Sequence, residues 1–303
     1  MLRLICVAFA TTLFLPSAGA EDFLVFYLGG QSNMDGFGTS SDLPATLQAE
    51  TDIPIFHGNP VGDLDRSGGL GKWEMLRPGH GIGFSSDGKQ NKLSDRFGVE
   101  VTLGKRLSEL FPEHRIALIK YSRSGSSIAE EAAGRFGCWE PDFQQGDGEA
   151  AGINQYDHFL KTIRMAFAER DIDGDGTEDT LIPAGIVWMQ GESDANAGPD
   201  IAKRYQSNLK RLMDLIRAAF RADDLAVVIG RISDSGQDSD GRVWDHGDQV
   251  RVAQAAYVSA DSNAALVTTT DDYDYSDKWH YDSAGYIDLG RQFAEALRSL
   301  QIP

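Results

Sequence analysis

Cysteine is nearly absent from this chain, since only Cys6 and Cys138 occur among its 303 residues. Cys6 lies in an N-terminal segment that we expect to be removed, which leaves Cys138 without a partner for an internal disulfide. The fold must therefore be stabilised by a hydrophobic core, and the chain is long enough to bury one. No base accompanies Cys138 in the sequence, so we expect its thiol to be inert.

Long hydrophobic runs are also missing. The longest apolar stretch, Leu4–Leu15, is shorter than the roughly 20 residues that span a bilayer. It follows Arg3 and precedes Ala18-Gly19-Ala20, a pattern typical of a secretory signal peptide. We predict that residues 1–20 are cleaved near Ala20 and that the mature protein is secreted or periplasmic. A membrane anchor is the alternative, and no other segment is long enough to form one.

Basic residues are scarce relative to acidic ones. The chain has 28 Lys and Arg against 46 Asp and Glu, a net charge of −18 that becomes −19 once Arg3 is removed. This charge argues against a nucleic-acid partner, because phosphates require a basic surface. It suits a neutral substrate, a cation-rich medium or bound Ca²⁺.

Apolar runs alternate with amphipathic helical patterns along the chain. Five runs are typical of buried parallel strands: Phe23–Leu28, Arg115–Tyr121, Pro183–Met189, Leu225–Ile232 and Ala264–Thr269. Between and after them, apolar residues recur every three or four positions over 103–110, 153–167, 201–220 and 286–300. The alternation predicts an α/β fold with a mainly parallel sheet of about five strands and helices on both faces.

No linker and no internal repeat divides the sequence, so we expect a single domain over residues 21–303. Two stretches depart from the alternation, Asp35–Asn91 and Gly134–Gly152, and both are rich in Gly, Ser, Asp and aromatic residues. Long irregular segments in a compact domain are usually functional loops. We expect these two to form the rim of a cleft.

The pentapeptide Gly30-Gln31-Ser32-Asn33-Met34 follows the first predicted strand directly. Open α/β sheets carry their chemistry just beyond the carboxyl ends of the strands, which makes Ser32 a candidate nucleophile. Near the other terminus, Asp277 precedes His280 by three residues and supplies the acid and the base of a serine hydrolase. Taken alone, Ser32 could instead be a helix N-cap, and the Asp277–His280 pair could be a surface pair.

A serine esterase also needs donors for the oxyanion that forms when the hydroxyl attacks a carbonyl. Three candidates follow predicted strands: the backbone N–H of Ser32, the backbone N–H of Gly125 and the side-chain amide of Gln190. Each lies past a carboxyl end, where the donors could converge. Gly125 alone would be interpreted as a turn glycine.

These blocks together resemble the SGNH-hydrolase superfamily, specifically its branch of sialate O-acetylesterase-like proteins and carbohydrate esterase family 6 acetylxylan esterases. The resemblance implies a three-layer α/β/α sandwich and removal of acetyl groups from sugar hydroxyls, with no metal in the chemical step. It also implies a catalytic triad of Ser32, Asp277 and His280, and oxyanion positions at Ser32, Gly125 and Gln190. The supporting positions are Gln31, Asn33 and Glu192. Whether Glu192 braces its loop or helps to orient His280 is left open.

A second motif starts at Asp171. Oxygen-bearing side chains at alternate positions, with Gly176 at the sixth, match the start of a calcium-binding EF-hand loop. The candidate ligands are Asp171, Asp173, Asp175, Thr177 and Asp179. Ile182 stands at the twelfth position, where such a loop has a bidentate Glu. The motif therefore predicts either a structural Ca²⁺ site away from the chemistry or an empty acidic turn.

Arg123, Trp139 and His80 are candidates for lining a sugar cleft, because aromatic faces and forked donors suit a pyranose, although such aromatics more often pack in the core. The leading hypothesis is a secreted carbohydrate O-acetylesterase that forms an acetyl-enzyme on Ser32. One alternative is a lipase or thioesterase of the same superfamily. The other is a calcium-dependent glycan-binding protein without turnover.

Overall fold

The central strand of the fold is β1 (Asp22–Gly30), in which every side chain from Phe23 to Leu28 is buried. The computed structural model describes residues 21–300, so the predicted signal peptide lies outside the described residues. β1 belongs to a seven-stranded sheet in the order β11-β10-β9-β1-β8-β3-β4. The other strands are β3 (Pro54–His57), β4 (Trp73–Met75), β8 (Arg115–Ser122), β9 (Thr180–Met189), β10 (Val227–Gly230) and β11 (Ala264–Val267).

The predicted fold class is confirmed, and all five predicted strands are present and parallel. The sheet is wider than expected because β3 and β4 extend it beyond β8. β3 runs parallel to β8, whereas the edge strand β4 is antiparallel to β3. Both come from the stretch that the sequence predicted to be irregular. Polar residues and a proline interrupt them, since β3 reads Pro-Ile-Phe-His and β4 reads Trp-Glu-Met, so neither produces a recognisable apolar run.

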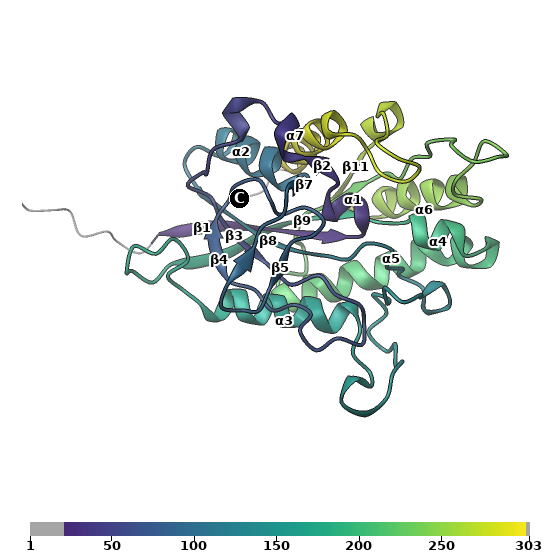
Figure 1. The fold of residues 1–303 in the computed structure, drawn as a ribbon, viewed down its shortest axis with the longest axis horizontal. Coiled ribbons are helices and arrows are strands. Elements are labelled where there is room, and N and C mark those ends of the chain that lie inside the picture. Colours follow the sequence, from purple (N-terminus) through teal and green to yellow (C-terminus); the bar gives the residue numbers. More distant parts are fainter. Residues whose placement is uncertain (1–20, 301–303) are drawn as a thin grey trace, which may run out of the picture.

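Helices cover both faces of the sheet (Figure 1). The predicted ones are α2 (Glu100–Leu110), α3 (Gln155–Ala168), α5 (Pro199–Phe220) and α7 (Ser283–Ser299). The structure adds α6 (Gly247–Ala260) and two short helices, α1 (Ser32–Asp35) and α4 (Glu192–Asn196). The small strands β2 (Gly38–Thr39) with β7 (Arg96–Phe97), and β5 (Ser85–Ser86) with β6 (Asn91–Lys92), form two further two-stranded sheets.

Neighbouring side chains of β1 show how the layers form. Phe26 points to one face, where its ring lies 6.4 Å from that of Phe111 after α2. Tyr27 points to the other face, where its ring lies 4.9 Å from Phe159 of α3 and 5.9 Å from Phe220 of α5. This alternation places α2 and α7 on one side and α3 and α5 on the other, as Figure 1 shows. The result is a three-layer α/β/α arrangement.

The carboxyl ends of the central strands are level. Gly30 of β1 pairs with Ser122 of β8 and with Met189 of β9, and Gly230 of β10 also pairs with Met189. Residues that follow these strands therefore come together at one edge of the sheet. Among residues 21–300, no helix is long and apolar enough to cross a membrane.

Candidate active site

Ser32 is the first residue of α1, directly beyond the end of β1. The chain turns there through Gly30, which has a φ of 143°. Gly30 also packs closely on β9, where an added Cβ would lie 2.0 Å from the Met189 carbonyl oxygen. The Gln31 N–H donates to that same oxygen at 2.9 Å. A glycine is required at this point, and the close approach fixes the position of Ser32, which is only 7% exposed.

Asp277 and His280 form a hydrogen-bonded pair in the loop between β11 and α7. Asp277 Oδ2 lies 2.8 Å from His280 Nδ1, while Oδ1 accepts from the backbone N–H groups of Trp279 and His280 at 2.7 and 2.9 Å. Partial burial raises the pKa of Asp277, but these hydrogen bonds outweigh it, so the pKa lies below its ordinary value. The pair thus has the geometry in which a carboxylate holds a histidine with Nε2 free to act as a base.

The histidine ring is also held from the side by Phe37, which was not among the predicted site residues. The Phe37 and His280 rings are stacked, with centroids 3.5 Å apart and an interplanar angle of 5°. Asp277 and Phe37 together fix the plane of the imidazole.

Asn33 joins the two halves of the site. Its Nδ2 donates to the Trp279 carbonyl at 3.3 Å, and its Oδ1 accepts from the Tyr286 hydroxyl at 2.8 Å and from the Tyr281 N–H at 3.5 Å. The residue that follows Ser32 thus contacts both sequence neighbours of His280. Two segments separated by almost the full length of the chain meet at this residue.

In the part of the chain that the structure describes, no hydrogen bond joins Ser32 Oγ to His280 Nε2. Catalytic hydrogen bonds of this kind are often long in the absence of substrate and tighten in the Michaelis complex. The structure therefore brings the segments of Ser32 and His280 together through Asn33, without a hydrogen bond between the hydroxyl and the imidazole.

Gly125 lies in the turn 123–126 that follows β8, here called the Gly125 turn. The Ser126 N–H donates to the Arg123 carbonyl at 3.2 Å, and the Arg123 N–H donates to the Gly30 carbonyl of β1 at 3.0 Å. Gly125 has a φ of 73°, and a Cβ there would lie 2.4 Å from the Phe136 ring. Both the conformation and the space require glycine. Neither the Ser32 N–H nor the Gly125 N–H has an acceptor among the described residues.

Gln190 lies at the end of β9 and is fully buried. Its Nε2 donates to Asp194 Oδ2 at 2.7 Å and lies within 3.3 Å of the Gln31 Oε1 and the Ser126 carbonyl oxygen. Its Oε1 accepts from the Tyr205 hydroxyl at 2.9 Å. The amide therefore bridges the segments that carry Ser32 and Gly125, with its own donors directed at protein acceptors.

Glu192, the first residue of α4, is also buried. Its Oε1 accepts from Asn33 Nδ2 at 2.8 Å, and its Oε2 has no hydrogen-bond partner within the described residues. Burial raises the pKa of Glu192, although the Asn33 hydrogen bond opposes this shift. Within residues 21–300, Glu192 makes no hydrogen bond or ion pair with the His280 ring, whose Nδ1 is bound to Asp277.

The model of a carbohydrate esterase family, described as sialic acid-specific acetylesterase, matches residues 22–299. The chain belongs to this carbohydrate esterase family. The match confirms the resemblance inferred from the motifs. It covers nearly all the residues of the esterase that the structure describes. No protein with a curated functional description matches its sequence.

Solved structures with a similar fold share little sequence with this esterase. A protein from Arabidopsis thaliana aligns with a TM-score of 0.61 and 18% identity, over 92% of this chain and 98% of its own. A carbohydrate acetylesterase from Xanthomonas citri aligns with a TM-score of 0.59 and 17% identity, over 91% of this chain but only 56% of its own. NanS aligns with a TM-score of 0.57 and 14% identity, over 94% and 99%. At these identities the likeness shows the shared fold.

Two of the three residues predicted to line a sugar cleft are in the core of the esterase. Trp139 is fully buried against Trp188, and its indole N–H, which would otherwise be unsatisfied there, donates to Ser126 Oγ at 2.9 Å. His80 is fully buried beside His57, and burial lowers its pKa to about 3. Neither residue lines an open cleft, so that part of the prediction is wrong. Arg123 is partly exposed, and its guanidinium carbon lies 5.0 Å from the centre of the Phe136 ring.

The sequence prediction also omitted Trp279, whose side chain is 47% exposed beside His280. The sequence did contain a signal for Trp279, because it lies between Asp277 and His280 in the Asp-x-x-His motif. A loop that presents a histidine to substrate also presents the residue next to it. Cys138 is a free, buried cysteine. Burial raises the pKa of its thiol to about 12, which disfavours the reactive thiolate and agrees with the expectation from the sequence.

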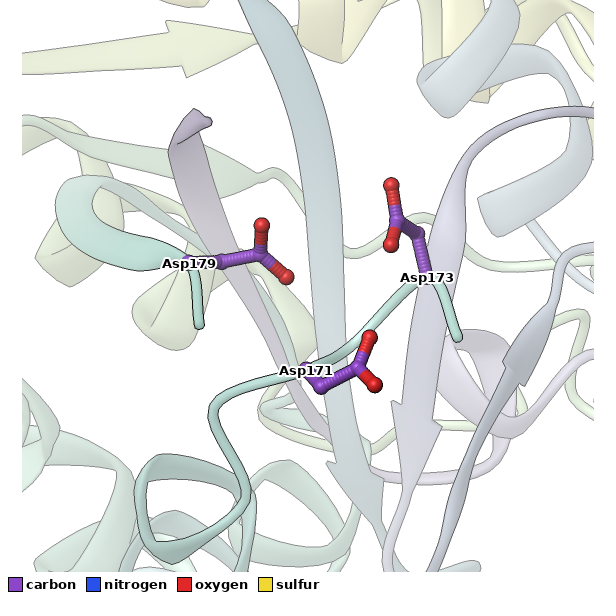
Figure 2. A group of neighbouring side chains, drawn as sticks. All are labelled: Asp171, Asp173 and Asp179. Atoms are coloured by element: carbon purple, nitrogen blue, oxygen red, sulfur yellow. The ribbon is translucent and has the colours of Figure 1, made fainter. Parts of the chain in front are cut away.

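The acidic loop lies at the opposite edge of the sheet, just before β9. Figure 2 shows the carboxylates of Asp171, Asp173 and Asp179, each of which offers an oxygen within 4.8 Å of the others. Asp175 is not part of this group; its Oδ1 accepts from the Thr177 N–H at 2.7 Å. Arg115 at the start of β8 lies 3.6 Å from Asp173. The oxygen donors suit Ca²⁺, and the loop is remote from Ser32.

Proposed function

We propose that the protein is a secreted serine esterase that removes O-acetyl groups from a carbohydrate through an acetyl-serine on Ser32. The observation that carries this proposal is the contact of Asn33 with both neighbours of His280, since it brings the candidate base to the candidate nucleophile. Membership of the carbohydrate esterase family supports the reaction class. The signal-peptide pattern at the N-terminus supports export.

In the proposed reaction, His280 Nε2 removes the proton of Ser32 as Oγ bonds to the acetyl carbon. The carbonyl oxygen becomes an oxyanion that accepts from the backbone N–H groups of Ser32 and Gly125. Collapse of this intermediate breaks the bond to the sugar oxygen, which takes the proton from His280. Water then attacks the acetyl-serine with His280 again as the base, releasing acetate and restoring the hydroxyl.

Two further residues support a sugar substrate. The exposed indole of Trp279 offers an apolar face beside the base, which suits the C–H surface of a pyranose. On the side of the Gly125 turn, the Arg123 side chain makes no hydrogen bond or ion pair among residues 21–300. This guanidinium lies over the Phe136 ring and has no carboxylate partner there, which suits polar or anionic groups of an acetylated sugar.

A comparison of p-nitrophenyl acetate with the octanoate tests this function, with Ser32→Ala as the control. We expect the acetate to be preferred, and we expect acetate release from acetylated sugars that Ser32→Ala does not catalyse. Preference for the longer chain would indicate a lipase or thioesterase. Binding of glycans by a wild-type protein without turnover would indicate a lectin-like role.

A further inference from the structure

We propose that Asp35 is a positioning residue that holds the Gly125 turn in register with the nucleophile. This inference rests on the proposed function, because it concerns the same oxyanion donors. Asp35 is the last residue of α1, and Ser32 is the first, so one short helix carries both. The Asp35 side chain is 3% exposed and was not a predicted site residue.

The carboxylate of Asp35 binds the end of β8 and the start of the Gly125 turn with both oxygens. Oδ1 accepts from the Ser122 hydroxyl. Oδ2 accepts from the Ser124 hydroxyl and, at 2.7 Å, from the Ser124 backbone N–H. The residue directly before Gly125 is therefore fixed by its backbone as well as by its side chain, which constrains where the Gly125 N–H points.

The backbone of Asp35 is held equally firmly. Its N–H donates to the Gln31 carbonyl at 2.9 Å, which closes the turn around Ser32. Its carbonyl accepts from Lys120 Nζ at 2.8 Å. Lys120 is fully buried and directs its other hydrogen bonds to Glu100 and to the His80 carbonyl, each at 2.8 Å. Because Lys120 and Ser122 are both in β8, Asp35 is attached to this strand through its backbone and through its side chain.

This arrangement couples the two candidate oxyanion donors. The Ser32 N–H belongs to α1, whereas the Gly125 N–H belongs to a turn more than 90 positions away. Asp35 is the side chain of α1 that hydrogen-bonds to that turn. A donor pair stabilises an oxyanion only when both N–H groups point at one position, so the cross-link should matter in the transition state rather than in substrate binding.

The charge of Asp35 and its positioning role predict opposite changes in kcat when Asp35 is replaced, so the role can be tested. A carboxylate near a developing negative charge repels it, so removing the charge of Asp35 would by itself accelerate the reaction. Loss of positioning would slow it. The sign of the change in kcat for Asp35→Asn therefore distinguishes the two effects.

The experiment measures kcat and KM for p-nitrophenyl acetate and the inhibition constant of phenylboronic acid, which adds to the serine hydroxyl and mimics the tetrahedral intermediate. For Asp35→Asn we expect kcat to fall about 10- to 100-fold, with KM within about threefold of the wild-type value. The inhibition constant should rise in parallel. A purely structural role would lower the melting temperature without weakening boronic acid binding by folded enzyme.

Asp261→Asn is the matched control, since Asp261 is a partly buried carboxylate bound to Arg217 and Tyr257 at the end of α6. We expect it to change stability and leave kcat unchanged. If Asp35→Asn does not fold, the double variant Ser122→Ala, Ser124→Ala removes the two hydroxyl contacts with Asp35 and keeps the one from the Ser124 backbone N–H, so we expect a smaller fall in kcat in the same direction. An unchanged or raised kcat in the folded variant would overturn the inference, whereas an inactive wild-type enzyme would overturn the proposed function.

Discussion

The Nδ2 of Asn33 lies 2.8 Å from the buried Oε1 of Glu192, and this bond ties the turn that carries Ser32 to helix α4. The same amide group contacts the loop of His280 through the Trp279 carbonyl. Asn33 therefore lies at the junction of three segments that follow different strands. The hydrogen bonds of Asn33 to Glu192 and Trp279 therefore help to set the orientation of Ser32 relative to His280.

Replacing Asn33 by alanine should separate these segments. We expect Asn33→Ala to lower kcat/KM for p-nitrophenyl acetate about 100-fold, because small misplacements of catalytic groups cost up to this factor. Asn263→Ala removes a surface amide that binds the Asp224 carbonyl and should leave kcat/KM unchanged. Steady-state kinetics with equal activity in both variants would show that Asn33 does not hold the site together.

Glu192 should brace the site rather than supply charge to His280. Glu192→Gln keeps an oxygen for Asn33 and should retain activity within about tenfold of wild type, whereas loss of a charge that orients the histidine would cost about 10⁴ in kcat. Glu192→Ala leaves the Asn33 amide without this acceptor and should be more damaging. If kcat fell as far in Glu192→Gln as in Asp277→Asn, the result would indicate that Glu192 orients His280.

Glu192 should also leave a signature in the pH dependence of stability. Because burial raises its pKa, the folded state holds the proton more tightly than the unfolded state does. Stability therefore falls as pH rises from the ordinary Glu pKa to the raised one. Glu192→Gln cannot ionise and should lack this decline. Urea unfolding of both proteins across this range measures the difference, and parallel curves would contradict it.

Asp277→Asn should impair catalysis with little effect on stability. We expect kcat/KM to fall between about 10² and 10⁴, because the amide no longer holds the productive tautomer of His280. The side chain of Asp277 is 43% exposed, so the melting temperature should change little. Since its pKa is lowered, Asp277 stays ionised through the acid side of the assay range. Asp238→Asn, which breaks the neighbouring ion pair with Lys278, is the control and should remain active.

The acidic loop before β9 should respond to calcium without affecting the chemistry. If Asp171, Asp173 and Asp179 bind Ca²⁺, a concentration about 100 times the dissociation constant stabilises the fold by about 2.7 kcal/mol. The melting temperature should then rise with added Ca²⁺ and fall with EDTA, while kcat is unchanged. Asp173→Asn should lose this response, and the exposed Asp147→Asn should keep it. A melting temperature insensitive to both reagents would leave the loop as an acidic turn.

The parts of the fold that the sequence predicted are those with a strong local signal. β1, β8 and β9 are rich in apolar residues because helices cover the sheet on both faces. β3 begins with Pro54 and ends with His57, and the buried face of α6 includes Ala253 and Gln254, so neither gives a clear pattern. The position of the site followed from where the strands end.

Contacts between distant residues could not be predicted in the same way. Trp139 was a candidate for a cleft although such residues more often pack in the core, and the structure gives it a buried position with Ser126 Oγ as the partner of its indole N–H. The contact of Asp35 with Ser124 spans 89 positions and depends on the pairing of β1 with β8. Residues such as Asp35 and Phe37 have no motif of their own, and only the fold brings them to the site.

The most direct test of the account is the intact mass of the enzyme after brief exposure to p-nitrophenyl acetate and acid quenching, with wild type and Ser32→Ala compared. We predict that wild type gains a single acetyl group, that peptide mapping places it on Ser32, and that the variant gains none and does not turn over the ester. Acetylation or full turnover in Ser32→Ala would contradict the assignment of Ser32 as the nucleophile.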